Sequence, residues 1–257
     1  MRFVSMIRLS VAIITFNEEK NIGRCLASLK DVADEIIVVD SNSTDNTAEI
    51  ARSYGAKVIL NSFEGYGQQK NLATDSASND WVLSLDADEE LAPEITKSIL
   101  QVKQHQQYNV YEMARFTNYC GQWIKHSGWY PDKQTRLYNR TKGRWIEKKV
   151  HEYWDLFEEG KKGLLKGDLL HYSYSSLEDH LSKIDRYSEL SALDAVARGK
   201  KASLLTIIFS PFWHFFNEYF MKLGFLDGFH GYTICKLSAY ATFSKYTKIR
   251  MFSKMQR

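Results

Sequence analysis

Cysteine is scarce in this sequence, and the spacing of the cysteines matches neither a disulfide framework nor a metal site. The 257 residues contain three cysteines, Cys25, Cys120 and Cys235, which are far apart and form no CxxC pair. This usage argues against a disulfide scaffold and against a structural zinc site. It is typical of a protein in a reducing cytoplasm, so the small disulfide-rich secreted classes are excluded.

Net charge is also low. The 34 Lys and Arg residues against 31 Asp and Glu residues give a formal charge of +3 at pH 7. A protein whose main partner is nucleic acid needs a concentrated basic face, so we predict no nucleic-acid partner. The distribution is uneven, because from Lys222 onward seven basic residues face a single acid, Asp227. The C-terminus is therefore a basic tail.

Long hydrophobic runs are missing as well. The N-terminal run leads into Asn17 and Glu18 without a small-residue cleavage site, so we interpret it as a buried strand rather than a signal peptide. The uncharged stretch 202–217 contains Pro211 and is shorter than the roughly 20 apolar residues of a transmembrane helix. With 25% charged and 44% hydrophobic residues, the chain is globular and long enough to bury a sizeable core.

Short apolar runs alternate with segments of helical spacing over the first hundred residues. Strands are predicted at 9–15, 35–40, 56–60 and 81–85, and helices at 17–30, 48–54, 68–77 and from Pro93. This alternation predicts an α/β fold with a Rossmann-like, mainly parallel sheet flanked by helices, and ligands bound beyond the carboxyl ends of its strands. Asn17, Asp40 and Asp86 each follow a strand, so we expect them at one edge of the sheet.

The pattern changes in the second half of the chain. Residues 110–170 are dense in aromatic and turn residues, and we predict that they complete the sheet and the second half of a cleft. Residues 177–196 have helical spacing behind a serine cap. We therefore divide the chain into a catalytic domain, 1–172, and a helical, amphipathic and basic C-terminal extension, 173–257.

The strongest local feature is the pair Asp86 and Asp88 at the end of an apolar strand, followed by two glutamates. Carboxylates this close repel one another unless a cation lies among them, and Mg²⁺ or Mn²⁺ prefers oxygen ligands while leaving positions for a diphosphate. The alternative is a solvated acidic turn that caps the next helix, which is the commoner role of an isolated DxD.

Other polar residues follow the predicted strands. Thr15, Asn17 and Glu18 come after the first strand and offer groups that could contact a base or ribose, although Asn17 could equally be a helix cap. Asp40 is placed to accept hydrogen bonds from ribose hydroxyls, or only to cap the next turn. Lys70 could meet a phosphate, or be an exposed helical lysine.

Four segments, taken in order, resemble those of glycosyltransferase family two: VAIITFNEEKNIGRCLASL, EIIVVDSNSTDNTAEIA, GYGQQKNLA and WVLSLDADEEL. The likeness covers roughly residues 8–172, and it is greatest to the bacterial lipopolysaccharide-core β-1,4-glucosyltransferases. It implies a GT-A fold and an inverting transferase that takes a hexose, typically glucose, from a UDP-sugar with Mg²⁺ or Mn²⁺. It also implies that Thr15, Asn17, Glu18 and Asp40 face the nucleoside, with Lys70 near it or its phosphates.

The resemblance also implies roles for Asp86 and Asp88 at the metal and diphosphate and for a Val-His-Glu motif. An inverting transferase needs a base for the acceptor hydroxyl. We predict Glu152 as the base and His151 as a metal or diphosphate ligand, although their roles could be reversed because histidine is also a good base. Many family members outside this group have a Glu-Asp pair in the corresponding region, which this chain lacks.

Two further positions match the same group. Asp132 could bind donor or acceptor hydroxyls or act in catalysis, and Arg136 could offset diphosphate charge as UDP leaves. Each could instead belong to a turn or an ion pair.

The tail has the composition expected at an anionic bilayer surface, because aromatics cluster in residues 209–220 ahead of the basic residues. We predict a helix lying on the inner face of the bacterial cytoplasmic membrane, near a lipid-linked acceptor. The alternatives are packing on the catalytic domain or a homodimer interface.

The predicted acceptor is the heptose-containing inner core of lipopolysaccharide. A capsule, a polyprenyl-linked glycan or a protein acceptor would suit the same fold. A nucleotide-sugar-binding protein without turnover is disfavoured by the intact Asp86, Asp88 and Glu152, and a phosphate-metabolising enzyme by the lack of a P-loop.

Overall fold

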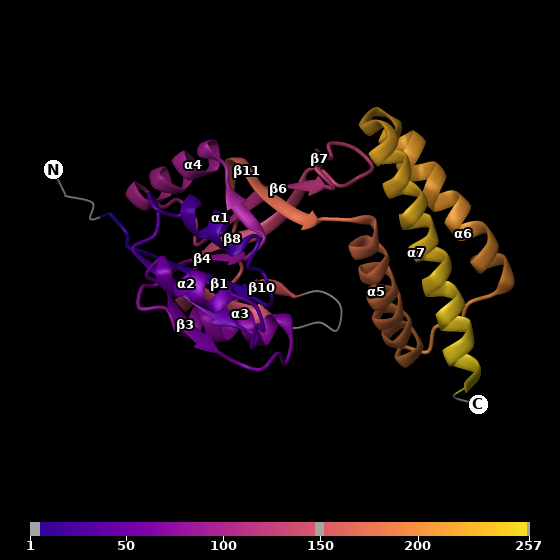
Figure 1. Ribbon diagram of the computed structural model, residues 1–257, viewed down its shortest axis with the longest axis horizontal. Coiled ribbons are helices and arrows are strands. Elements are labelled where there is room, and N and C mark those ends of the chain that lie inside the picture. Colours follow the sequence, from indigo (N-terminus) through magenta and orange to yellow (C-terminus); the bar gives the residue numbers. More distant parts are fainter. Residues whose placement is uncertain (1–5, 147–151, 256–257) are drawn as a thin grey trace. The chain divides into compact units, whose positions relative to one another are not determined.

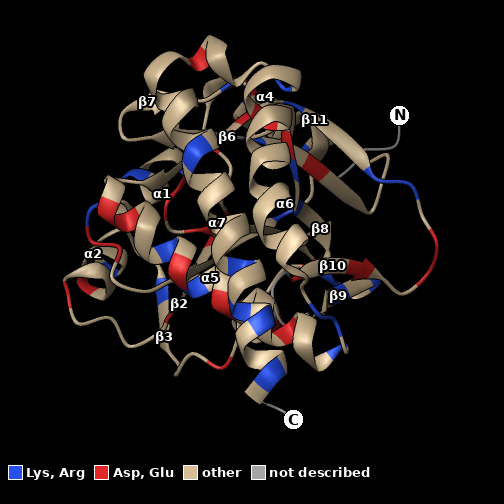
Figure 2. Ribbon diagram, turned by 90° about the vertical axis from the view of Figure 1, so that its right-hand side faces the viewer, with Lys and Arg blue, Asp and Glu red and all other residues tan. Residues whose placement is uncertain are grey.

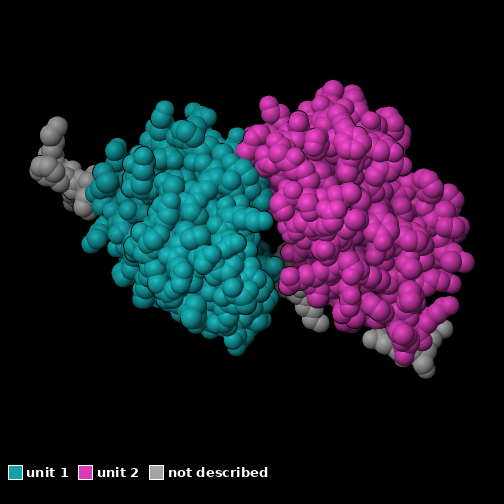
Figure 3. Space-filling model, viewed as in Figure 1, with its two compact units in different colours: residues 1–115, 132–172 teal, residues 116–131, 173–257 magenta. Residues whose placement is uncertain are grey.

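The computed structural model describes residues 6–146 and 152–255, and the chain divides into two compact units. We call residues 1–115 and 132–172 the sheet unit, and residues 116–131 and 173–257 the helical unit (Figure 3). Residues 116–131, predicted to lie in the catalytic domain, belong to the helical unit. The reason is apolar packing, because Tyr119 and Ile124 are buried against Ile234.

The described strands form one nine-stranded sheet and a separate two-stranded hairpin (Figure 1). The sheet order is β3-β2-β1-β4-β8-β6-β11-β5, with β7 paired to β6, and β9 and β10 form the hairpin. The strands are β1 (Leu9–Thr15), β2 (Glu35–Asp40), β3 (Lys57–Leu60), β4 (Trp81–Asp86), β5 (Glu89–Leu91), β6 (Val110–Tyr119), β7 (Gln122–Trp123), β8 (Asp132–Asn139), β9 (Gly143–Ile146), β10 (Tyr153–Leu156) and β11 (Gly163–Tyr174).

The predicted α/β fold is confirmed, and its parallel part consists of the first four strands. β1 pairs in parallel with β2 and β4, and β2 with β3. Beyond β4 the sheet is antiparallel, since β8 runs against both β4 and β6, and β11 against β5. Apart from β5, these strands come from the aromatic segment that begins at residue 110, where the sequence lacks the alternation of strand and helix that marks a parallel sheet.

Helices of the sheet unit cover both faces of the parallel strands. They are α1 (Ile22–Ser28), α2 (Thr47–Ser53), α3 (Tyr66–Asp75) and α4 (Pro93–Gln104), with a short 3₁₀ turn η1 (Arg140–Lys142). One face of β1, with Val11 and Ile13, packs in a cluster with residues of α1, α2 and α4. The other face, with Ala12 and Ile14, packs with residues of α3 and the β9–β10 hairpin. Alternation of side chains along a strand thus feeds two cores, which explains why these strands are apolar throughout.

Over its described residues, the helical unit contains three long helices and two short turns. They are α5 (Leu177–Ala197), α6 (Leu204–Phe216), a π-helical turn η2 (Asn217–Met221), a 3₁₀ turn η3 (Gly224–Asp227) and α7 (Gly228–Met255). α7 lies between α5 and α6 (Figure 1). Serines cap two of these helices, because the Ser176 and Ser203 side chains accept from the backbone of Asp179 and Thr206, each at 3.1 Å. Among the described helices, none combines the length and apolar character needed to cross a bilayer.

Candidate active site

The carboxyl ends of three strands bring the predicted polar residues to one edge of the sheet. Thr15 stands opposite Asp40 in the β1–β2 register, and Asp86 stands opposite Ile14 in the β1–β4 register. The strand order therefore aligns residues that are 25 and 72 positions apart in sequence, as expected for parallel strands.

Asp86 lies at the end of β4 between two cations. One carboxylate oxygen, Oδ2, accepts from Arg136 on β8 at 2.7 Å, and Lys70 Nζ on α3 lies 3.3 Å from Oδ1. Burial opposes ionisation of this carboxyl, but the charges of Arg136 and Lys70 outweigh it and hold the pKa of Asp86 well below its usual range. Asp86 is therefore an anion at every physiological pH.

Glu89 holds the turn that follows β4. Its carboxylate is fully buried and accepts hydrogen bonds from the Asp86 backbone N–H at 3.0 Å and from Arg136 at 2.6 Å. Arg115 Nη1 lies 3.7 Å from the same carboxylate. Arg115 in turn pairs with Asp132 Oδ2 at 2.6 Å. The other oxygen of Asp132 accepts from Gln134 at 2.8 Å. Both oxygens of Asp132 are thus engaged, which disfavours it as a base.

Lys70 joins the acidic turn to Glu152. Its side chain is only 3% exposed, donates to Glu152 Oε1 at 2.8 Å, and lies 4.8 Å from the ring centroid of Trp145. Burial alone would raise the pKa of Glu152, but the adjacent Lys70 ammonium lowers it overall. Glu152 is therefore ionised at neutral pH and able to accept a proton. The alternative of an exposed lysine is wrong for Lys70.

Asp88 lies on the other side of the turn. Its Oδ2 is 3.3 Å from His171 Nε2 on β11, and about a fifth of its side chain is exposed. Asp86 instead pairs with Lys70 and Arg136. Asp88 thus adds a second carboxylate to this turn, beside His171.

The residues predicted to face the nucleoside form hydrogen bonds within the loops that follow the strands at this edge of the sheet. Asn17 adopts a left-handed backbone (φ 52°) and its side chain accepts from the Thr44 N–H at 2.8 Å. Glu18 accepts from the Asn21 amide at 2.7 Å. Asp40 is 1% exposed, and both of its oxygens accept from Ser43. For Asp40 the capping alternative is what the structure shows, and a contact with a nucleoside stays a prediction.

Thr15 differs from these neighbours. It is 6% exposed, and its hydroxyl makes no hydrogen bond among the described residues. A buried hydroxyl without a partner is costly unless a ligand or water supplies one. This rim position is thus suited to a polar ligand.

The oxygen atoms at the acidic turn fit a divalent cation that shares its coordination with a substrate. Asp86 Oδ1 is buried and accepts no hydrogen bond among the described residues. Over the same residues, no three His, Cys, Asp or Glu side chains are gathered to enclose a metal by themselves. Mg²⁺ commonly binds one or two carboxylates together with substrate phosphates and water, so Asp86 and Asp88 suffice on the protein side. The third predicted ligand, His151, lies outside the described residues.

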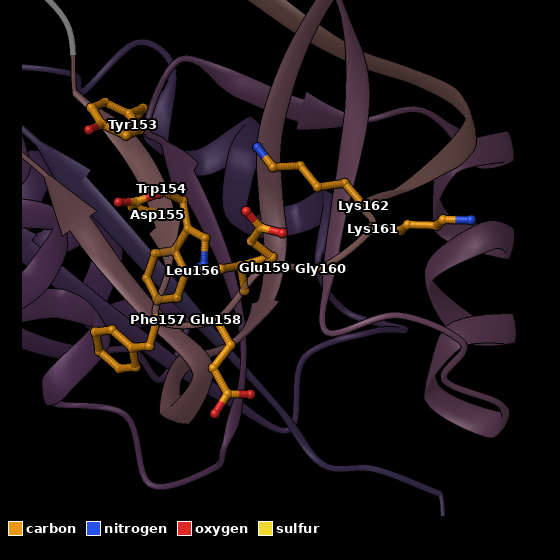
Figure 4. Close-up of a pocket in the computed structure, with 10 residues that line it drawn as sticks. All are labelled: Tyr153, Trp154, Asp155, Leu156, Phe157, Glu158, Glu159, Gly160, Lys161 and Lys162. Atoms are coloured by element: carbon orange, nitrogen blue, oxygen red, sulfur yellow. The ribbon is translucent and has the colours of Figure 1, made fainter.

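A surface hollow of about 740 Å³ is lined by residues 153–162 (Figure 4). It is formed by β10 and the loop leading to β11, and it includes none of the acidic residues at the end of β4. We assign the chemistry to the charged residues around the end of β4 rather than to this hollow, because they include ionised and partly unsatisfied groups. We call this set the charge cluster: Lys70, Asp86, Asp88, Glu89, Arg115, Asp132, Arg136, Glu152 and His171.

Three residues of the cluster escaped sequence reasoning as individual site residues: Glu89, Arg115 and His171. Glu89 was hidden in an acidic run, where one buried glutamate cannot be told from its solvated neighbours. Arg115 and His171 lie in strands that contain several other polar residues, so the sequence does not distinguish them from solvent-facing neighbours.

A scan against protein-family models matches residues 10–167 to glycosyl transferase family 2. The chain belongs to this family. The match includes every described residue of the charge cluster except His171.

Relatives of this glycosyltransferase are similar over nearly their whole length. An uncharacterized glycosyltransferase of Rickettsia typhi is 36% identical over 98% of this chain and 90% of its own. The lipopolysaccharide core biosynthesis glycosyltransferase LpsC of Rhizobium meliloti is 31% identical over 94% of this chain and 91% of its own.

Among solved structures, glucosyl-3-phosphoglycerate synthase from Mycobacterium tuberculosis, crystallised with Mn²⁺, UDP and glucosyl-3-phosphoglycerate, is 24% identical with a TM-score of 0.37. The alignment covers 44% of each chain.

Proposed function

We propose that this glycosyltransferase transfers a hexose from a UDP-sugar to a lipid-linked saccharide, with inversion at the anomeric carbon. Glucose is the first hexose to test. The observation that carries the proposal is the charge cluster at the end of β4, where Asp86, Lys70, Arg136 and Glu152 lie within ion-pair distances. Acidic groups for a cation, basic groups for a diphosphate and an ionised carboxylate are the parts that such a transfer needs.

The donor's diphosphate would be held from two sides. Asp88, with Asp86 Oδ1, would hold Mg²⁺ or Mn²⁺, which when bound neutralises charge on the departing diphosphate. Lys70 and Arg136 lie beside Asp86 and would offset the same charge from the protein. Thr15 supplies a free hydroxyl at the neighbouring strand end, toward the nucleoside.

Glu152 would act on the acceptor. Its carboxylate takes the proton of the acceptor hydroxyl as that oxygen forms a bond to the anomeric carbon, while the bond between this carbon and the UDP oxygen breaks. Lys70 keeps Glu152 ionised before the reaction. The similarity to LpsC supports a saccharide of the lipopolysaccharide core as acceptor.

The proposal is tested by measuring UDP or GDP release from a panel of UDP- and GDP-sugars, with Mn²⁺, with Mg²⁺ and with a chelator. We expect release from a UDP-hexose that requires the metal. Failure to bind or cleave any nucleotide sugar would refute the enzymatic function, and undiminished turnover with the chelator would refute the metal's role.

A further inference from the structure

The outer face of α6 is a continuous apolar surface. Helical spacing brings six large side chains to it, each more than half exposed: Leu204, Leu205, Ile208, Phe209, Phe212 and Trp213. The helix contains no Lys, Arg, Asp or Glu, and Figure 2 shows it without a charged residue along its length. A contiguous exposed apolar surface of this kind marks an interaction site, so this face requires a partner.

The helical unit has apolar side chains both inside and outside. Its interior cluster includes Ala192, Val196, Ile207 and Ile249. The outer face of α6 nevertheless exposes larger side chains, with Phe212 73% exposed and Trp213 66%. Water-soluble proteins bury their largest apolar residues preferentially. These exposed aromatic side chains indicate that the outer face lies in an apolar medium when the protein works.

The charges around this face have one sign. From residue 198 to residue 255 the sequence contains two acids, Glu218 and Asp227. Both are buried, and each carboxylate contacts a histidine: His214 lies 3.2 Å from Glu218, and His126 lies 3.0 Å from Asp227.

Exposed lysines stand at both ends of the apolar surface. Lys200 and Lys201 come directly before α6, and Lys222 directly follows η2. The apolar face therefore has a cationic border with no exposed acid in the same segment.

We propose that the outer face of α6 docks on an anionic lipid bilayer, with its aromatic and leucine side chains at the acyl boundary and the bordering lysines against lipid phosphates. Phe, Trp and Leu on one face with basic residues beside it are the features of a helix that lies in the membrane interface. α6 then lies on the membrane without crossing it, in keeping with the lack of a spanning helix among the described residues. This docking is independent of sugar transfer.

A second copy of the chain fits this surface less well. In a two-fold symmetric dimer the same patch meets itself, so the bordering lysines of one copy would approach those of the other. No exposed acid between residues 198 and 255 is present to compensate them. An anionic bilayer supplies the complementary charge over the whole border.

The experiment measures co-sedimentation of the full chain with phosphatidylcholine vesicles, with and without phosphatidylglycerol, in the absence of nucleotide sugar. We expect binding to the anionic vesicles that weakens with salt. The variant F209Q/F212Q/W213Q should lose roughly tenfold or more of its vesicle partition coefficient. F157Q is the matched control, because Phe157 is 65% exposed in the sheet unit, and it should bind like the parent.

The charge variant K200Q/K201Q should bind anionic vesicles roughly tenfold more weakly than the parent, because each lysine removed takes away one attraction to the anionic lipid surface. Parental binding by F209Q/F212Q/W213Q, equal binding of the parent to neutral vesicles, or no vesicle binding at all would each overturn the proposal. So would a parental dimer, seen by light scattering, that the triple variant converts to monomer. UDP-sugar hydrolysis by the triple variant, measured without lipid, should match the parent, so loss of docking is distinguishable from loss of the enzyme.

Discussion

Glu89 links the acidic turn to the two arginines beside it. It is less exposed than any other carboxylate of the cluster, and it contacts Arg136, Arg115 and the backbone of Asp86 at once. Removing one partner from a buried ion network leaves uncompensated charge, which costs more than the network itself contributes. Glu89 therefore fixes where Arg136 presents its charge to Asp86.

We expect Glu89→Gln to lower the free energy of unfolding by about 2 to 4 kcal/mol, because Arg136 loses a buried counter-charge. Chemical denaturation at pH 7 measures it. The adjacent Glu90→Gln is the control, since Glu90 is partly exposed and should cost less than about 1 kcal/mol. Equal losses in the two variants would contradict the special role of Glu89.

Glu152 is the residue whose chemistry is most directly testable. Glu152→Gln should lower kcat by at least about 100-fold, because the amide cannot accept the acceptor's proton. UDP affinity should stay within about twofold, since the diphosphate is assigned to other residues. The exposed Glu158→Gln serves as control. Near-parental turnover of Glu152→Gln would move the base to His151 or Asp132, and the engaged oxygens of Asp132 would then favour His151.

At the scale of elements, the start of the parallel sheet is tied to the end of α4. Lys103 is buried and donates to Asp34 at 2.7 Å and to the Val32 carbonyl at 2.8 Å, while Asp34 also accepts from the Leu9 N–H. Desolvation raises the pKa of Asp34, but the hydrogen bonds from Lys103 and Leu9 outweigh it, so the folded-state pKa is lowered. The ionised carboxyl therefore stabilises the fold.

This stabilisation is present above the unfolded-state pKa of about 3.9 and is lost as the pH falls through the lower folded-state pKa. Asp34→Asn should therefore lower Tm at pH 7, and the difference from the parent should shrink as the pH falls below about 4. Thermal unfolding at several pH values measures this, with the exposed Asp31→Asn as control. A Tm difference that is the same at pH 7 and in acid would contradict the ion pair.

The sequence predicted the elements with strong local patterns. Strands β1 and β2 have the predicted bounds, and α4 begins at Pro93, whose fixed φ suits the first helical turn. The antiparallel half of the sheet was not predictable in detail, because its pairing depends on contacts distant in sequence. α7 was not recognised as one helix of 28 residues, since it packs through small residues such as Gly231 and Ala239 and shows little apolar periodicity.

The candidate site was predictable in its parts but not in its pairing. Asp86, Lys70, Arg136 and Glu152 stood out by their type and by their place after strands or in motifs. Their ion pairs join residues of different elements, namely α3, β4, β8 and the residue before β10. No local spacing in the sequence predicts these contacts. The same limit applies to Asp40, where only the structure distinguishes a capping carboxylate from a free one.

At the scale of the whole molecule, the proposed sugar transfer belongs to the sheet unit and the proposed membrane docking to the helical unit. The family match ends at residue 167, close to the start of the helical segment at residue 173. Relatives such as LpsC nevertheless match along both units. We infer that transfer and membrane docking are properties of the same protein carried by separate surfaces.

The central claim is that carboxylates at the end of β4 hold a cation that binds the donor's diphosphate. Calorimetric titration of UDP with and without Mn²⁺, in the parent and in Asp88→Asn, tests this, because the change removes one carboxylate of the turn and leaves Asp86 with Lys70 and Arg136. We expect Mn²⁺ to raise the UDP affinity of the parent by roughly tenfold or more and that of the variant little or not at all. The same Mn²⁺-dependent gain in the folded variant, or no gain in the parent, would contradict it.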